Sequence, residues 1–194
     1  MNTPISYSPE TYKKNDGELN STLSNMFADA TYEMSNPVFN KMSGKNIDIV
    51  LLNNGGIRSI ISKGNISEKT AFELMPFENS IVVLELNGLS IIKMIDYLRK
   101  VKLQHPISGL QITLNNDYSV NEVKINGVSI ENEKKYYVAT TDYLLEGGDK
   151  MYFLAETTKT TDINYKMRDI LIDYFKQYDT LKLKSDNRFI RINE

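Results

Sequence analysis

The sequence predicts a single α+β domain in which helices pack on a mixed β-sheet. Short β-branched or alternating runs, typical of strands, are interspersed with longer stretches whose apolar residues recur at helical spacing. The chain of 194 residues is long enough for one well-packed core, and no internal shift in composition marks a linker. We therefore divide it into an extended lead-in over residues 1–16, outside the core, and one domain over residues 17–194.

The composition excludes several classes of protein. Hydrophobic residues make up 41% and charged residues 25%, which is typical of globular domains and not of disordered or fibrous chains. The net charge is −2, and the basic residues are scattered among acidic ones, so a nucleic-acid polymer is not an expected partner. The chain has no cysteine, which excludes disulfides and thiolate metal sites. We expect no transmembrane segment. The first residues lack a signal segment, which leaves either a cytoplasmic protein or one whose signal segment has been removed.

Helices and strands are expected to follow one another along the chain. We expect helices over residues 18–36, 68–75, 89–101 and 164–178. We expect strands over residues 47–52, 80–87, 111–114, 120–125, 136–141 and 188–192, the last of them at a sheet edge. Pro37 is expected to end the first helix, with a second short helix between it and the next strand. Ser67 is the expected N-cap of the helix that Met75 and Pro76 end.

One turn is a candidate binding element. The strand over residues 47–52 runs into Asn53-Asn54-Gly55-Gly56-Ile57-Arg58. Paired glycines let a backbone turn sharply and lie bare against a ligand. The guanidinium of Arg58 offers a rigid fork of donors that suits a phosphate or a carboxylate. Taken alone, the same pattern is common in ordinary surface turns.

Three further blocks follow this turn in order: Met75-Pro76-Phe77-Glu78-Asn79, Ser108-Gly109-Leu110, and Thr141-Asp142-Tyr143-Leu144-Leu145-Glu146-Gly147-Gly148-Asp149. The four blocks together resemble the C-terminal domain of the 5'-nucleotidase family, which includes animal ecto-5'-nucleotidases and bacterial periplasmic UDP-sugar hydrolases. The resemblance covers residues 17–155 closely and the remainder loosely. It implies an α+β fold of 5'-nucleotidase C-terminal type, in a hydrolase of nucleotide catabolism whose substrate specificity this domain sets.

The resemblance assigns roles to individual residues. In the family, two aromatic side chains sandwich the nucleotide base, and the matching positions are Phe77 and Tyr143. A carboxylate that bonds the ribose hydroxyls matches Asp149. The remaining substrate-binding matches are Asn53 beside the ribose, Arg58 at the phosphates, Gly55 and Gly56 in the turn, Asn79 along the base edge, and Gly109, whose backbone faces the base in some relatives.

Each of these residues also has an ordinary structural interpretation. A loop aromatic often folds back onto its own domain, and an aspartate in a tight turn often bonds its own backbone. An asparagine at a strand end caps a turn, and an exposed arginine commonly forms a surface ion pair. What favours a binding site is the occurrence of the whole set in one order.

The chain departs from the family at one position. Relatives supply a further phosphate-contacting arginine from the segment after the first helix, whereas Met34-Ser35-Asn36-Pro37 contains none. Lys41 is the expected substitute, as a point charge without the bidentate fork of an arginine. The ligand is therefore left open between a nucleotide, a nucleoside and a nucleotide sugar.

The resemblance places catalysis outside this chain. Family members hydrolyse phosphate esters with a two-metal centre of His, Asp and Asn ligands in a separate N-terminal domain. This chain has a single histidine, His105, and no Asp-x-His or Gly-Asn-His cluster. We assign it no catalytic residue, no metal site and no cofactor, and we expect divalent metals only in a metallophosphatase domain or partner chain.

Three interpretations remain. The chain is the nucleotide-recognition part of a 5'-nucleotidase-type hydrolase, a stand-alone nucleoside- or nucleotide-binding module without catalysis, or a structural remnant with an empty pocket. The combination of Phe77, Tyr143, Asp149 and Arg58 favours the first two, because packing alone does not require it. Family resemblance implies a periplasmic or extracellular location.

Overall fold

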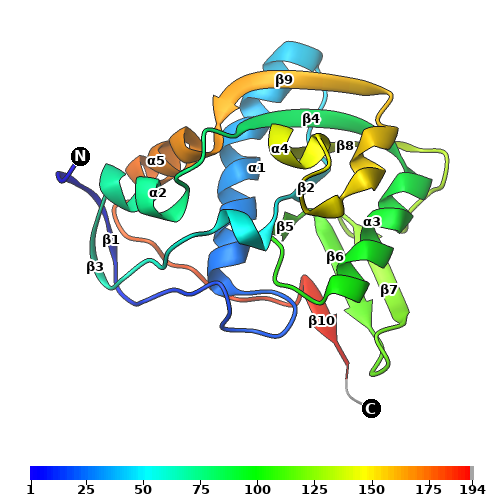
Figure 1. Ribbon diagram of the computed structural model, residues 1–194, viewed down its shortest axis with the longest axis horizontal. Coiled ribbons are helices and arrows are strands. Elements are labelled where there is room, and N and C mark those ends of the chain that lie inside the picture. Colours follow the sequence, from blue (N-terminus) through cyan, green and yellow to red (C-terminus); the bar gives the residue numbers. More distant parts are fainter. Residues whose placement is uncertain (193–194) are drawn as a thin grey trace.

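A five-stranded sheet forms the centre of the molecule (Figure 1), whose computed structural model describes residues 1–192. Its strands lie in the order β5-β2-β8-β4-β9. β2 is parallel to β8, while the other three pairs are antiparallel, so the sheet is mixed. The strands are β5 (Ile107–Ser108), β2 (Ile49–Leu51), β8 (Lys135–Thr141), β4 (Ser80–Asn87) and β9 (Lys159–Lys166). The predicted α+β class is confirmed.

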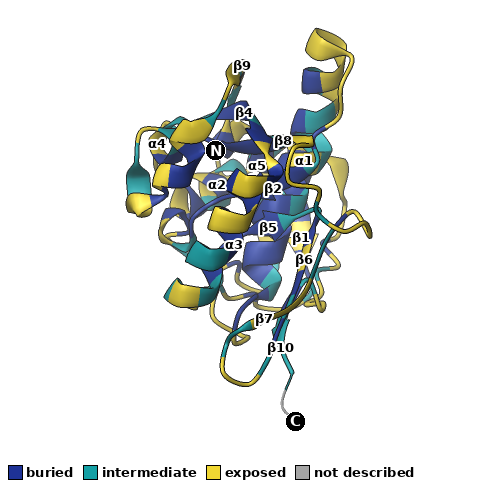
Figure 2. Ribbon diagram, turned by 90° about the vertical axis from the view of Figure 1, so that its right-hand side faces the viewer, coloured by how far each residue is buried: buried dark blue, intermediate teal, exposed yellow. Residues whose placement is uncertain are grey.

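Helices cover both faces of this sheet. On one face, α1 (Thr22–Ser43) and α5 (Met167–Gln177) pack on a cluster that includes Val83, and on the other α3 (Gly88–Val101) packs on a cluster that includes Val82. Neighbouring strand residues point to opposite faces, so β4 contributes to both cores. Figure 2 shows buried residues along the strands and exposed ones on the outer faces of the helices.

Two smaller sheets flank the central one. β10 (Phe189–Arg191), β6 (Leu110–Leu114) and β7 (Val120–Ile125) form a three-stranded sheet with β10 at an edge, as the sequence predicts. β1 (Pro4–Ser8) pairs with β3 (Gly64–Ser67), next to α2 (Glu68–Leu74). Figure 1 shows α2, α5 and this pair at one end of the molecule and α3 with β6 and β7 at the other. Short helical turns complete the fold: η1 (Asn54–Gly56), α4 (Asp142–Leu145), η2 (Gly148–Lys150) and η3 (Tyr152–Glu156).

Local side-chain chemistry sets the beginnings of the helices. The side chain of Ser21 accepts a hydrogen bond from the Ser24 amide at the start of α1. Ser67 and Thr70 form a capping box at the start of α2, and Met75 ends that helix, as expected. Such caps satisfy amide donors that have no partner within the helix. Of the helices in residues 1–192, none combines the length and the apolar composition that crossing a bilayer requires.

The expected helix end at Pro37 is wrong. α1 continues through Pro37 to Ser43, and Gly44 closes it in the left-handed conformation at φ 70°. Proline removes one amide donor, but the flanking side chains of Met34, Val38 and Phe39 pack on the core and hold the helix together. Tertiary packing therefore outweighs the local penalty.

Two other expectations also need correction. Residues 159–166 form strand β9, so the last helix begins at Met167 and not at residue 164. Only Ile163 of this strand is buried, which is why its sequence lacks a strand pattern. The lead-in is not outside the core, because β1 pairs with β3 and Tyr12 is buried in the core cluster.

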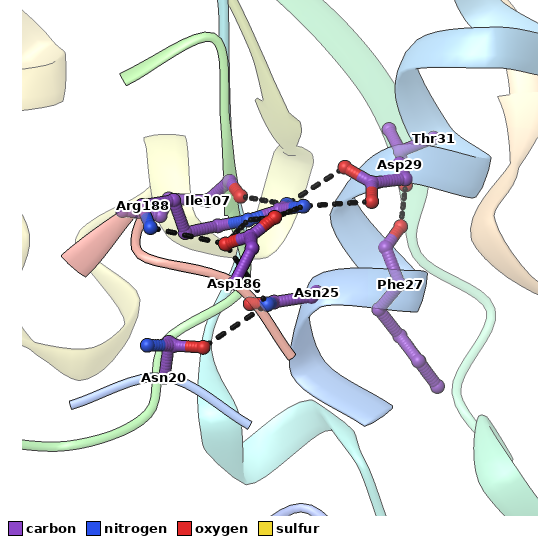
Figure 3. A network of polar contacts seen from close by, with 8 residues as sticks. All are labelled: Asn20, Asn25, Phe27, Asp29, Thr31, Ile107, Asp186 and Arg188. Atoms are coloured by element: carbon purple, nitrogen blue, oxygen red, sulfur yellow. Dashed lines mark hydrogen bonds and ion pairs between the residues drawn. The ribbon is translucent and has the colours of Figure 1, made fainter. Parts of the chain in front are cut away.

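A partly buried arginine, Arg188, ties the C-terminal segment to the rest of the domain (Figure 3). The guanidinium of Arg188 donates both Nη atoms to the carboxylate of Asp29 on α1, at 2.7 and 2.9 Å, and donates Nε to Asp186. Its Nη1 also donates to the carbonyl of Ile107, at 2.8 Å. The side chain is only 14% exposed, so solvent screens these contacts less than it screens surface pairs.

We expect Arg188→Ala to lower the free energy of unfolding by about 2–4 kcal/mol, because it removes a largely buried guanidinium together with its bonds to two carboxylates and to the Ile107 carbonyl. Urea denaturation followed by circular dichroism measures the change. Arg99→Ala is the matched control, since Arg99 pairs with the exposed Asp96 on the same helix and such pairs contribute less than about 1 kcal/mol. Equal losses in the two variants would contradict this role of Arg188.

Candidate functional site

A cavity of about 300 Å³ brings together residues from three separate loops. One loop follows β2, one precedes β4 and one follows β8. β2 and β8 are parallel and β4 is antiparallel to β8, so two strands end and one begins at the same edge of the sheet. The lining residues are Asn53, Gly55, Gly56, Arg58, Phe77, Asn79, Tyr143 and Asp149. Eight of the nine predicted site residues therefore line one cavity.

The turn after β2 forms one wall of the cavity. Its side-chain anchor is Asn53, which is buried and donates from Nδ2 to the carboxylate of Asp149 at 2.8 Å. A Cβ atom on Gly56 would lie 3.1 Å from the Asn53 amide oxygen, so a side chain there would press on the anchor. The exposed guanidinium of Arg58 stands 6.0 Å from the centre of the Phe77 ring, and its Nη1 donates to the Gly55 carbonyl.

Two aromatic rings line the cavity from different loops. Phe77 is 43% exposed and Tyr143 is 44% exposed, so neither ring is folded into the core. Gly148 makes room for Tyr143, because a Cβ atom at this position would lie 2.4 Å from the ring. Glycine is therefore required at position 148, the second glycine of the Gly-Gly-Asp block, because any side chain there would clash with the Tyr143 ring.

The loop that carries Phe77 is held by an ion-pair group. Arg168, on α5, bonds Glu78 and donates to the carbonyl of Pro76 at 3.5 Å. Hydrogen bonds from Lys166 and Arg168 lower the pKa of Glu78 to about 2. The carboxylate thus stays charged throughout the ordinary pH range, and the loop keeps its anchor.

Asp149 is the charged centre of the site. One carboxylate oxygen accepts from Asn53 and the other accepts from the Tyr143 hydroxyl at 3.2 Å. The backbone of Asp149 is left-handed, at φ 51°, and so is that of Lys150, at φ 61°. Such conformations cost roughly 1–2 kcal/mol in residues other than glycine, so the surrounding contacts must hold this turn in place.

Lys14 is a residue of this region that sequence reasoning missed. Its ammonium donates to the carbonyls of Ile57, at 2.8 Å, and of Asn54, at 3.3 Å, and so braces the turn from behind. Burial, with a contribution from nearby Arg58, lowers the pKa of Lys14. The assignment of the lead-in as an extended segment outside the core hid this contact. Lys41, the expected substitute for the missing arginine, is exposed on the last turn of α1 and does not line the cavity.

The single histidine lies beneath the same turn. His105 is 2% exposed, and its Nδ1 accepts a hydrogen bond from the backbone amide of Asn54 at 3.1 Å. Burial lowers its pKa from 6.5 to about 4, against the opposing field of Asp149. A neutral imidazole is therefore part of the support of the turn. Within residues 1–192, no three His, Asp or Glu side chains converge as a metal site would require.

Gly109 is not part of the cavity. It lies in another surface hollow, with Asn126 and Arg188, and its φ is +74°. A Cβ atom on it would lie 1.9 Å from the carbonyl oxygen of Asp48. Glycine is thus needed there for a close backbone contact, and its position does not support the predicted contact with a base.

Comparisons with known proteins agree with this architecture. The family model described as 5'-nucleotidase, C-terminal domain, matches residues 4–156. The chain belongs to the 5'-nucleotidase family. The match begins at residue 4, within the segment that contains β1 and the buried Tyr12.

Individual relatives of this 5'-nucleotidase C-terminal domain are considerably longer. It is 32% identical over 115 residues to Protein UshA of Escherichia coli (strain K12), covering 56% of this chain and 20% of that protein. It is 30% identical over 171 residues to Cell wall protein Lmo0130 of Listeria monocytogenes, covering 80% of this chain and 21% of that protein. The crystal structure of a 5'-nucleotidase precursor from Thermus thermophilus superposes with a TM-score of 0.85 at 23% identity, over 100% of this chain and 40% of that one.

We expect the His105 ring protons to titrate near pH 4, and not near 6.5, in a proton NMR experiment. The chain has one histidine, so the signal is unambiguous. Because the folded pKa is below the unfolded one, the unfolded chain takes up the proton first as pH falls from 6.5 to 4. The free energy of unfolding should therefore decline across this window, and less so in His105→Asn. A midpoint near 6.5 would contradict the neutral, buried imidazole.

Proposed function

We propose that this domain recognises a nucleotide or nucleoside for a 5'-nucleotidase-type phosphohydrolase. The observation that carries the proposal is that two half-exposed rings, a carboxylate and a guanidinium line one cavity. An apolar clamp with a few convergent polar groups is the usual make-up of a small-molecule site. Because the chain belongs to the 5'-nucleotidase family, a nucleotide or nucleoside is the ligand that best explains this combination.

The base would stack between Phe77 and Tyr143. Aromatic rings bind any base through its flat face, so this contact selects nucleosides without fixing which base is bound. Asn79, at the same cavity, has an amide that is suited to hydrogen-bonding a base edge. The half-exposed rings support this role, since a ligand would cover apolar surface that is now in water.

The ribose hydroxyls would bond the carboxylate of Asp149. A carboxylate has about four lone-pair sites, and the contacts from Asn53 and Tyr143 leave capacity for the two hydroxyls of a ribose. Hydrogen bonds to a charged acceptor are about twice as strong as neutral ones. The phosphates would lie at Arg58, with the positive charge of nearby Lys14 adding to the field.

Phosphate ester hydrolysis would take place on a metallophosphatase domain or partner chain, where divalent metals activate the attacking water. The much greater length of the relatives supports a further domain beside this one. Binding of the base and ribose here would position the phosphate for that reaction. By the same reasoning we propose a periplasmic or extracellular location, which the name of the listerial cell wall relative supports. The alternative is a stand-alone binding module without a catalytic partner.

We expect Phe77→Ala and Tyr143→Ala each to weaken AMP binding by about 1–3 kcal/mol, the scale of a lost aromatic stack on a base. Isothermal titration calorimetry measures the change. Tyr32→Ala is the matched control, because Tyr32 is 38% exposed and lies on α1, outside the cavity lining. An unsubstituted chain that gives neither heat nor a shift in thermal midpoint with millimolar AMP would contradict nucleotide recognition.

We expect the chain alone to release no phosphate from AMP, with or without added divalent metals. Mixing it with a metallophosphatase domain of the same family should restore hydrolysis, as measured by a phosphate release assay. Hydrolysis by the pure chain alone would overturn the division of roles. Binding without hydrolysis in any such mixture would favour the stand-alone module.

A further inference from the structure

The backbone of Asp149 is held in place by a residue outside the cavity lining. Tyr97, in the middle of α3, donates its hydroxyl to the backbone carbonyl of Asp149 at 2.8 Å. This carbonyl belongs to the left-handed pair Asp149 and Lys150, whose conformation is costly by itself. The bond is therefore placed where the turn most needs an external restraint.

The direction of the Tyr97 hydroxyl is itself fixed by packing. Its ring lies 5.9 Å from the His105 ring and 5.6 Å from the Phe153 ring, centre to centre, with both pairs tilted. Such tilted contacts are favourable aromatic geometries. His105 in turn accepts a hydrogen bond from the Asn54 amide. The packed rings of Tyr97, His105 and Phe153 therefore support both the turn after β2 and the turn that carries Asp149.

The electrostatics agree with a donor role. Burial raises the pKa of Tyr97, and the nearby carboxylate of Asp149 adds to the shift. The hydroxyl therefore keeps its proton at ordinary pH and remains a donor to the carbonyl. No side chain within the cavity performs this function, because Asn53 and Tyr143 contact the carboxylate and not the backbone of Asp149.

We propose that Tyr97 is a positioning residue that makes the cavity selective for a ribose with both hydroxyls. The inference rests on the proposed nucleoside recognition at Asp149. Tyr97 holds the turn in the position in which the Asp149 carboxylate, bonded to Asn53, can accept hydrogen bonds from a 2′,3′-diol. Loss of the hydroxyl lets the turn relax and moves the carboxylate away from the sugar, while α4 and the Arg168–Glu78 ion pair still hold the backbone segments that carry Tyr143 and Phe77.

Tyr97→Phe tests this with two ligands, adenosine and 2′,3′-dideoxyadenosine, by calorimetry on the full chain. The substitution removes only the hydroxyl and keeps the ring. We expect the affinity for adenosine to fall about 3–10-fold, the effect of one lost hydrogen bond, and that for the dideoxy compound to change less than about twofold. The Tyr118→Phe variant is the matched control, because that hydroxyl bonds Glu18 outside the cavity, and it should bind both ligands as the unsubstituted chain does.

The NMR titration of His105 in Tyr97→Phe reports whether the packing survives, since the ring that remains should keep the imidazole pKa near 4. An equal loss of affinity for the two ligands, or no loss for adenosine, overturns the inference while nucleoside recognition stands. Failure of the unsubstituted chain to bind adenosine overturns the proposed function and, with it, the role of Tyr97.

Discussion

The pairing of β8 with β2 on one side and with β4 on the other is the constraint on which the site depends. One pairing is parallel and the other antiparallel, so the loops after β2 and β8 and the loop before β4 meet at one sheet edge. Residues as far apart in sequence as Asn53 and Asp149 then come within 2.8 Å of each other. The two packed faces of the sheet fix its strands, so the core determines where the three loops that line the cavity begin and end.

Around that edge, Asp149 and the turn after β2 each have supporting hydrogen bonds from other residues. Asn53 and Tyr143 hold the Asp149 carboxylate, Tyr97 holds its backbone, and Lys14 and His105 hold the opposing turn. If this cavity binds a ligand as we propose, it is preorganised for it, since its groups would lose little further freedom. The half-exposed rings of Phe77 and Tyr143 leave apolar surface in water, and this is the surface that a flat ligand would cover.

The sequence predicted eight cavity residues because four motifs occur in the same order as in the 5'-nucleotidase family. It predicted most helices and strands from hydrophobic periodicity. It failed where tertiary contacts overrule local signals: α1 passes through Pro37 because its neighbours pack on the core, and β9 has only Ile163 buried. Lys14 and Tyr97 were missed for a related reason. Their roles are hydrogen bonds to backbone carbonyls far along the chain, and no residue pattern encodes such a partner. Gly109 was assigned to the site by its block, but the close approach of Asp48 explains it.

The measurement that bears most directly on nucleoside recognition is a crystal structure of the chain with adenosine bound. We expect the base between the rings of Phe77 and Tyr143 and both ribose hydroxyls within hydrogen-bond distance of the Asp149 carboxylate, with the protein backbone at the cavity essentially unchanged. Adenosine bound at another surface, or bound in this cavity with its base away from the two rings, would contradict the assignment.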